Sequence, residues 1–454
     1  MTAKTITGKE LLFSVLRHEE TQAVPWVPFA GVHAGSLKGY NARQVLLDPD
    51  KLIEALLEVK KVYDPDGMPV LFDLQVEAEI LGCDLLWADE APPSVASHPL
   101  ANEKTVPTYI PKAEDGRFPH ILQVMRSMKK EVGDTTALYG LVTGPFTLAS
   151  HLRGTDIFLD SVDDPDFVTA LVEYTTRVAI AISQLYIDAG MDVIAIVDPL
   201  ISQISPRMFK RFFTQPFSTI FDHIRDQGVF SAFFVCGDAT KNVRVMCETN
   251  PDCIAVDENI DMAAAKTITD EFNITLSGNI PLTTCMLLGN QQDNMKYVVD
   301  LLETLDHHNL IISPGCDMPY SIPIENTIAA VQAVREPENT RKIVENYTRA
   351  EIDIPITLPD YSSLSKPLIE VFTLDPDTCA ACTYMWRAAQ KIKEILGDRI
   401  DLALYKITEL ETIARVKKMG IEKIPSIYIN GELKYSSIIP GQSEFLEEVE
   451  KSFH

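Results

Sequence analysis

The sequence predicts an α/β protein: a (β/α)8 TIM barrel followed by a small second α/β domain. Over the first 350 residues, eight short β-branched runs alternate with longer amphipathic segments, a pattern typical of βαβ units around a parallel sheet. A Pro/Ser-rich stretch then precedes a shorter pattern of strands and helices. The predicted organisation is a barrel over residues 1–350, a linker over 351–365 and a second domain over 366–454.

The predicted strands of the barrel are short apolar runs, and eight is the strand count of a (β/α)8 barrel. They cover residues 25–31, 69–73, 137–144, 193–198, 229–237, 253–258, 274–280 and 309–316. The segments between them are typical of helices, for example 167–189 and 206–227, which stop at Gly190 and Gly228. A doubly wound sheet alternates in the same way, so the pattern alone leaves that architecture open.

The composition is that of a soluble globular protein, but the charge is strongly acidic. The 454 residues include 40 Lys and Arg against 65 Asp and Glu, a net charge of −25. Residues 366–454 carry 12 basic and 14 acidic residues, so the excess acid lies in the first part. Such a surface repels phosphate and anionic lipid, so we expect no nucleic acid and no membrane as partner. The chain start lacks an apolar signal core, so we expect a cytoplasmic protein.

Small and polar residues follow most of the predicted strands, and barrel active sites are built at that end. These candidate site residues are Asp73, Gly144-Pro145, Asp198, Cys236, Asp257-Glu258, Gly278-Asn279 and Gly315-Cys316. Gly, Asn and Asp also favour ordinary turns, so a structural role stays open for Gly144, Gly278 and Asn279. With a nearby carboxylate or imidazole, Cys236 and Cys316 could hold a zinc ion that binds a substrate thiol as thiolate.

Four local sequences resemble the uroporphyrinogen decarboxylase superfamily, specifically its methylcobalamin:thiol methyltransferase branch. They are TGPFTLA at 143–149, VEAE at 76–79, GNI at 278–280 and SPGC at 313–316. The resemblance spans roughly residues 5–345 and implies a (β/α)8 barrel. It also implies that Asp198 and Asn279 shape the pocket, and that Gly144, Pro145, Gly278 and Asn279 border the corrinoid.

The same resemblance implies a zinc ion held by a His-x-Cys pair after the fifth strand, a Cys after the eighth and, in some members, a Glu after the sixth. Cys236, Cys316 and Glu258 match those places. Phe234 stands where the branch has its histidine, and a phenyl ring cannot coordinate zinc. Either another donor, such as His33, His151 or Asp198, completes the site, or the metal has been lost.

The implied function is methyl transfer from methylcobalamin, free or on a partner corrinoid protein, to a zinc-activated small-molecule thiol. One alternative is tetrapyrrole decarboxylation, because Asp73 matches the aspartate that anchors the tetrapyrrole NH groups. That branch also holds its polycarboxylate with an arginine in the loop after the first strand, whereas residues 29–36 contain none. A third hypothesis, favoured by Phe234, is that the barrel binds a corrinoid, a tetrapyrrole or a thiol ligand without catalysis.

The second domain carries a redox motif. A strand over 368–374 leads through Cys379-Ala-Ala-Cys382 into a helix. A cysteine at a helix amino terminus has a lowered pKa, and the second cysteine resolves the mixed disulfide. The stretch resembles the thioredoxin fold, with Pro425 at the place of its cis-proline. We expect Cys379, Cys382 and Pro425 to form the active part of a redox module that reduces the acceptor thiol, serves a redox partner protein or acts as a docking module.

Overall fold

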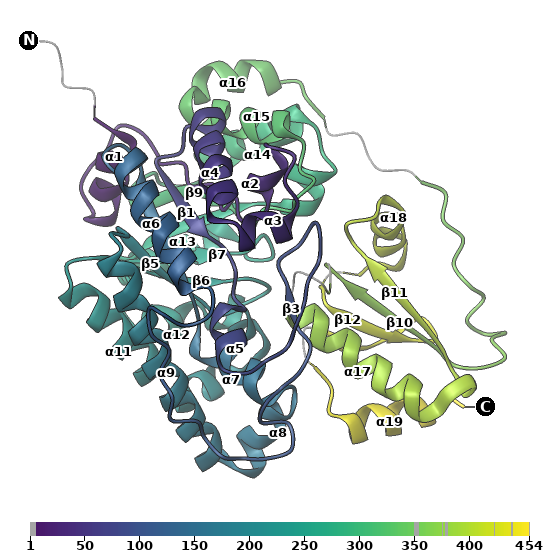
Figure 1. Ribbon diagram of the computed structural model, residues 1–454. Coiled ribbons are helices and arrows are strands. Elements are labelled where there is room, and N and C mark those ends of the chain that lie inside the picture. Colours follow the sequence, from purple (N-terminus) through teal and green to yellow (C-terminus); the bar gives the residue numbers. More distant parts are fainter. Residues whose placement is uncertain are drawn as a thin grey trace, which may run out of the picture. The chain divides into compact units, whose positions relative to one another are not determined.

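The computed structural model describes residues 6–348, 354–374, 376, 380–421, 423–436 and 439–453 (Figure 1). The chain divides into two compact units between Tyr347 and Thr348, close to the predicted boundary at residue 350. No helix within these described ranges is long and apolar enough to cross a membrane. Cys379, the first cysteine of the predicted CxxC motif, lies outside the described residues.

The N-terminal unit is built on one sheet of seven parallel strands, in the order β1-β4-β5-β6-β7-β8-β9. The strands are almost entirely buried, as expected for parallel strands that are covered on both faces. They are β1 (Gly67–Leu71), β4 (Ala137–Thr143), β5 (Val193–Val197), β6 (Phe230–Val235), β7 (Cys253–Val256), β8 (Thr275–Ile280) and β9 (Leu310–Pro314). A separate antiparallel pair consists of β2 (Leu85–Leu86) and β3 (Ser94–Val95).

The first predicted strand, residues 25–31, is not a full strand: it forms one isolated parallel bridge, between Trp26 and Ile312 of β9. The Val27 amide donates to the Ile312 carbonyl at 3.0 Å, and the Asp66 amide donates to the Trp26 carbonyl at 3.0 Å. The segment therefore lies between β9 and the start of β1. A longer ladder cannot form, because prolines at positions 25 and 28 have no N–H to donate.

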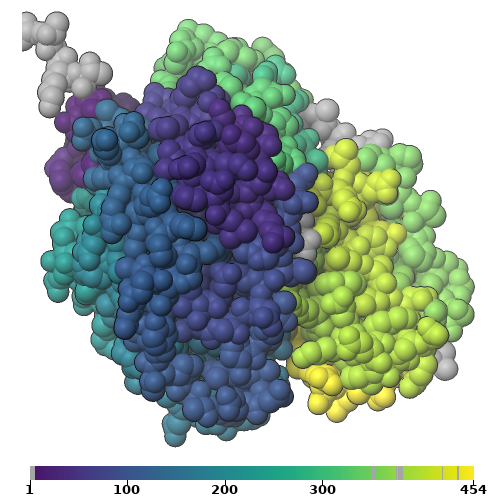
Figure 2. Space-filling model, viewed as in Figure 1, coloured from purple at the N-terminus to yellow at the C-terminus, as the bar shows by residue number. Residues whose placement is uncertain are grey.

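Helices surround the sheet and, with the loops, form the visible surface of this unit (Figures 1 and 2). The predicted helix over 167–189 is α9, whereas the one over 206–227 is split into α10 and α11 near Phe213. The helices are α1 (Gly8–Leu16), α2 (His33–Ser36), α3 (Ala42–Leu47), α4 (Pro49–Tyr63), α5 (Val76–Ile80), α6 (Phe118–Val132), α7 (Pro145–Arg153), α8 (Asp156–Asp163), α9 (Pro165–Asp188), α10 (Pro206–Phe212), α11 (Thr214–Asp226), α12 (Val243–Cys247), α13 (Met262–Glu271), α14 (Gln291–Thr304), α15 (Ile324–Arg335) and α16 (Pro337–Val344).

The C-terminal unit has a mixed sheet in the order β11-β10-β12-β13. The central strand β10 pairs parallel with β11 and antiparallel with β12. The peptide bond between Ile424 and Pro425, just before β12, is cis. The elements are β10 (Leu368–Thr373), α17 (Ala380–Leu396), β11 (Asp401–Lys406), α18 (Leu410–Met419), β12 (Ser426–Ile429), β13 (Glu432–Ser436) and α19 (Gln442–Glu450).

Part of the predicted linker belongs to this C-terminal unit. The Tyr361 hydroxyl donates to Glu370 on β10 at 2.8 Å, and Arg415 on α18 donates to the other carboxylate oxygen at 2.7 Å. Glu370 is fully buried, and burial raises the pKa of its carboxyl group. The Tyr361 ring also lies against Gly431, where an added Cβ would come within 2.6 Å of the ring. The chain is therefore held to the unit five residues before Lys366, the predicted start of the domain.

Candidate functional site

Two cysteines from distant parts of the sequence meet at the carboxyl end of the large sheet. Cys236 follows β6 and Cys316 follows β9, and the structure joins their sulfur atoms in a disulfide. Their Cα atoms are 6.0 Å apart, although 80 residues separate them in the sequence. Both are partly buried and pack against an apolar cluster of barrel residues that includes Phe234.

Phe234 fills the place where the family resemblance requires a histidine. Its ring is fully buried and lies 4.6 Å from that of Phe29 and 5.8 Å from that of Phe72, between ring centroids. Among the residues that the structure describes, no group of three or more His, Cys, Asp or Glu is arranged to hold a metal ion. The donor set therefore does not fit the predicted zinc ion: the two sulfurs are bonded to each other, and a phenyl ring stands at the third position.

Two of the three side chains predicted as replacement donors, those of His33 and Asp198, bind other groups. His33 is buried, with Nε2 at 2.7 Å from the Tyr63 hydroxyl and Nδ1 at 3.1 Å from the Tyr320 carbonyl. His151 is buried on α7, and Asp198 binds the first turn of that helix. None of the three is grouped with Cys236 and Cys316 as a metal site.

Burial gives His33 a measurable effect on the pH dependence of stability, since it lowers the pKa of the ring to about 4. The unfolded chain, with a pKa near 6.5, takes up a proton that the folded chain refuses, so the free energy of unfolding falls as pH drops from 6.5 towards 4. Between pH 7 and pH 5 we expect this residue to cost about 2 kcal/mol. Urea unfolding of wild type and His33→Gln at both pH values measures the difference. An equal loss in both proteins would contradict the assignment.

Two acidic residues follow β7 in the predicted position. The Leu282 amide donates to the Glu258 carboxylate, and the Asn259 amide donates to Asp257 at 2.9 Å. Burial, with the neighbouring Asp257 charge, raises the pKa of Glu258 to about 8, and burial also raises the pKa of Asp257. The backbone of Gly315 lies against Glu258, because a Cβ added to this glycine would be 2.8 Å from the Glu258 nitrogen. Glu258 is thus a neighbour of the residue before Cys316.

Asp198 holds the amino terminus of α7. Its carboxylate accepts hydrogen bonds from the Phe146 amide at 2.8 Å, the Thr147 amide at 3.1 Å and the Thr147 hydroxyl at 2.7 Å. Although these bonds favour the carboxylate, burial prevails and raises the pKa of Asp198 to about 7. Gly144 must lack a side chain here, since its Cβ would be 2.3 Å from the Asp198 Cβ. Gly144 and Pro145, predicted to border a cofactor, are therefore fixed by Asp198.

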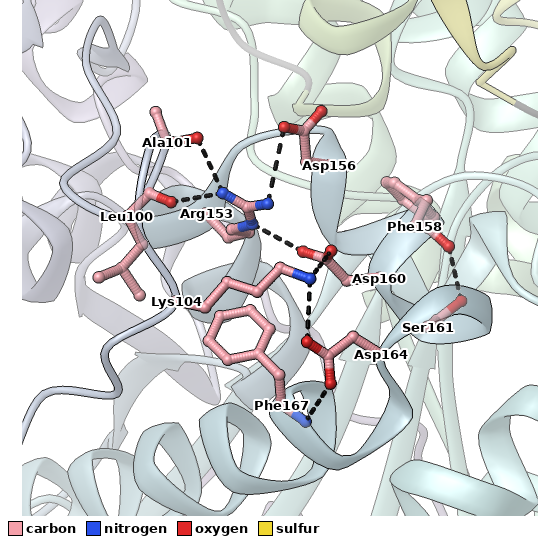
Figure 3. Close-up of polar contacts among 10 residues, drawn as sticks. All are labelled: Leu100, Ala101, Lys104, Arg153, Asp156, Phe158, Asp160, Ser161, Asp164 and Phe167. Carbon is pink, nitrogen blue, oxygen red and sulfur yellow. Dashed lines mark hydrogen bonds and ion pairs between the residues drawn. The ribbon is translucent and has the colours of Figure 1, made fainter.

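The other end of α7 is held by the ion-pair network in Figure 3. Arg153 donates through Nε to Asp160 on α8 at 2.6 Å, and through Nη1 to the Leu100 and Ala101 carbonyls at 2.6 and 2.8 Å. Lys104 pairs with the second oxygen of Asp160 at 2.8 Å. The network ties the loop around residues 100–104 to α7 and α8, so this helix is anchored at both ends.

Asn279 and Gly278 support the loop that carries Glu258. The Asn279 amide donates to the carbonyls of Asp257 and Ile260 at 3.0 and 2.8 Å, and its oxygen accepts from the Tyr297 hydroxyl at 2.8 Å. Gly278 has a φ of +153° and joins Asn279 through a cis peptide bond. A Cβ on Gly278 would be 2.9 Å from the Val256 carbonyl oxygen, so this strand end needs glycine.

Two polar residues at this end were not predicted as site residues. Arg117 donates to Asp73 at 2.7 Å and to Glu79 at 2.7 Å. Asp317, directly after Cys316, accepts from the Gly31 amide at 2.9 Å, and burial raises the pKa of its carboxyl group. Arg117 gives no local signal, since its partner Asp73 is 44 residues away and on another element. Asp317 could have been noticed from its place beside Cys316.

The comparisons with known proteins agree on the first three quarters of the chain. A family model described as uroporphyrinogen decarboxylase (URO-D) matches residues 7–337. The methylcobamide:CoM methyltransferase MtbA of Methanosarcina acetivorans is 26% identical over 337 residues, which are 72% of this chain and 98% of that protein. The corresponding MtaA of Methanosarcina barkeri is 28% identical over 286 residues, 60% of this chain and 80% of that one. The structure of a methyltransferase from Methanosarcina mazei aligns with a TM-score of 0.68 at 23% identity, covering 73% of this chain and 99% of that chain.

Proposed function

Because the chain belongs to the uroporphyrinogen decarboxylase (URO-D) family, and its relatives include methylcobamide:CoM methyltransferases, we propose that its barrel transfers a methyl group from a methylated corrinoid to a small-molecule thiol. The observation that carries the proposal is the match to MtbA over 98% of that protein's length. The fold similarity to the Methanosarcina mazei methyltransferase supports the same barrel architecture.

In the proposed reaction the thiolate attacks the methyl carbon of the corrinoid substrate. A sulfur–carbon bond forms, the cobalt–carbon bond breaks, and the electron pair stays on cobalt as cob(I)alamin. We place the reaction at the carboxyl ends of the strands, next to the start of α7, which Asp198 holds, and the loop that Asn279 braces. The corrinoid arrives free or on a partner protein. Zinc activation is not part of this proposal, because Cys236, Cys316 and Glu258 do not present a fitting donor set.

Thiol-dependent loss of methylcobalamin tests the proposal. We expect the anaerobic full-length protein to consume the cobalt–carbon absorption band of methylcobalamin with 2-mercaptoethanesulfonate, and the methylated thiol to appear in equal amount. Asp222→Asn, a change of an exposed carboxylate on α11, is the control that keeps this activity. Binding of methylcobalamin with no demethylation by any of a panel of thiols would contradict methyl transfer and favour the non-catalytic barrel.

Tetrapyrrole decarboxylation remains the weaker alternative. Asp73, the residue on which it depends, is bound by Arg117, so a positive charge does exist at this end of the barrel. That guanidinium already pairs with two carboxylates, those of Asp73 and Glu79. Their negative charges offset its positive charge, so it would attract a polycarboxylate substrate only weakly. Incubation with uroporphyrinogen and analysis of the porphyrin carboxyl count tests this alternative.

We also propose that the C-terminal unit is a thioredoxin-like redox module. The central position of β10, the helix α17 that follows the motif and the place of Pro425 directly before β12 support this proposal. Cys382 lies near the start of α17 and is buried. If the motif couples thiol redox state to methyl transfer, a Cys379→Ser/Cys382→Ser variant will lose turnover under oxidising conditions. Turnover at the wild-type rate in that variant would contradict the hypothesis that the motif is coupled to methyl transfer.

A further inference from the structure

The cysteine pair at the barrel end has the geometry of a redox site. Cys236 and Cys316 are the only cysteines that the structure describes in a disulfide. Each follows a different strand of a rigid sheet, and their Cα separation of 6.0 Å lies within the range of natural disulfides. Because the two strand ends set this Cα separation, we expect the bond to open and close without a large backbone movement.

The surroundings of the pair favour redox chemistry over metal binding. Phe234 puts a buried phenyl ring where the family resemblance implies a histidine, and the described residues contain no group of three or more His, Cys, Asp or Glu that could hold a metal ion. The other described cysteines are all buried, and burial raises the pKa of Cys83 and of Cys247 to about 12. Cys236 and Cys316 are partly exposed. Among the described cysteines of the N-terminal unit, they are therefore the ones that an external thiol or disulfide can reach.

We propose that Cys236 and Cys316 form a reversible redox pair at the carboxyl end of the barrel, reduced by thiol–disulfide exchange with a protein dithiol of the CxxC class. A thiolate of the dithiol attacks one sulfur of the pair, the Cys236–Cys316 bond breaks, and a mixed disulfide forms. The second thiol of the CxxC motif then attacks that mixed disulfide. Two electrons and two protons pass to the barrel, which now has two thiols, and the CxxC motif is left oxidised.

Two dithiols of the same chemistry could supply the electrons that reduce the Cys236–Cys316 disulfide. One is the chain's own motif, Cys379-Ala-Ala-Cys382, and the other is a separate protein of the thioredoxin type. Reduction presents two thiols at the barrel end, and oxidation by a disulfide of a small thiol, such as oxidised glutathione, removes them. Oxidation and reduction of Cys236 and Cys316 can be measured whether or not the barrel demethylates a corrinoid, so this redox pair does not depend on the proposed methyl transfer.

The first test maps the disulfide and measures the metal in the same preparation. Full-length protein from zinc-replete cells is equilibrated anaerobically with mixtures of reduced and oxidised glutathione, alkylated and digested. We expect mass spectrometry to find a peptide pair linking Cys236 to Cys316, with a two-electron transition, and far less than one zinc per chain. Cys236→Ala and Cys316→Ala will each lose the linked pair, and the control Cys247→Ala will keep it. Near-stoichiometric zinc that both single variants lose, or no linkage in any mixture, would overturn the proposal.

The second test identifies the reductant. Oxidised wild type and the Cys379→Ser/Cys382→Ser variant are treated with NADPH, thioredoxin reductase and thioredoxin, and thiols at positions 236 and 316 are counted over time. We expect reduction at least tenfold faster than by glutathione of equal thiol concentration. If thioredoxin no longer reduces the double variant faster than glutathione does, the chain's own motif is the direct reductant. If the faster rate persists in the double variant, the separate thioredoxin is the direct reductant. Reduction of both proteins no faster than by glutathione would overturn the proposal.

Discussion

Replacing Phe234 by histidine should give the reduced barrel about one zinc ion per chain, whereas wild type should hold far less. The ring at position 234 lies in the cluster against which Cys236 and Cys316 pack, two residues before Cys236 and so on the same side of the chain, and we expect an imidazole there to reach the two sulfurs. Two thiolates and an imidazole are one of the ligand sets that hold a catalytic zinc ion. Because structural zinc sites with four ligands bind with about 10 kcal/mol or more, we expect even a weaker three-ligand site to raise the metal content clearly above that of wild type.

Phe233→His is the matched control for this substitution. Phe233 is the preceding residue on β6, and its ring stacks on Phe217 of α11 with 4.2 Å between centroids, on the other face of the strand. We expect no zinc in this variant. Elemental analysis after anaerobic reduction and zinc loading measures all three proteins. Phe234→His that folds, as shown by circular dichroism, but binds no more zinc than Phe233→His would contradict the role given to the phenyl ring.

Asp198→Ala should lower the free energy of unfolding by about 3 kcal/mol. The substitution leaves two backbone amides and one hydroxyl without their acceptor at the buried start of α7, and each costs about 1–3 kcal/mol. Relief of the buried charge, whose desolvation raises the pKa of Asp198 to about 7, offsets part of this loss. Thiol-dependent demethylation should fall as well, because the residues at Gly144 and Pro145 lose their anchor.

Thr147→Val separates the carboxylate's role from that of a single hydrogen bond. It removes only the hydroxyl that donates to Asp198, so we expect a loss of about 1 kcal/mol in urea unfolding. Equal losses in Asp198→Ala and Thr147→Val would show that the two amides find other acceptors. In that case Asp198 would not be the anchor of the helix.

The strands and their ends could be predicted because they are local patterns. Seven of the eight predicted runs are strands, since β-branched runs between amphipathic segments fit a buried parallel sheet. The exception is residues 25–31, where the two prolines were visible in the sequence and should have argued against a ladder. Asp198 and Asn279 are predicted as site residues from their places at strand ends, but their hydrogen bonds to α7 and to the 257–260 loop depend on contacts between distant elements.

The contacts that decide the chemistry of the site are long-range and leave no local pattern. The pairing of Arg117 with Asp73 joins a helix start to a strand end, and only the folded chain brings the two together. The proximity of Cys236 and Cys316 follows from equivalent positions on parallel strands, so it could be predicted once the barrel was assumed. The disulfide between them could not, because the same spacing serves a shared metal ion.

The contact between Tyr361 and Glu370 affects where a fragment that contains the C-terminal unit should begin. A boundary at Lys366, where the composition changes, would leave out an aromatic residue whose hydroxyl shares a buried carboxylate with Arg415. A fragment that starts there would expose Gly431 and leave Glu370 with one fewer hydrogen-bond donor. We therefore expect such a fragment to have a lower free energy of unfolding than the intact C-terminal unit. A fragment of the C-terminal unit should therefore begin before Tyr361, and transfers of this unit to another protein should carry the tyrosine with it.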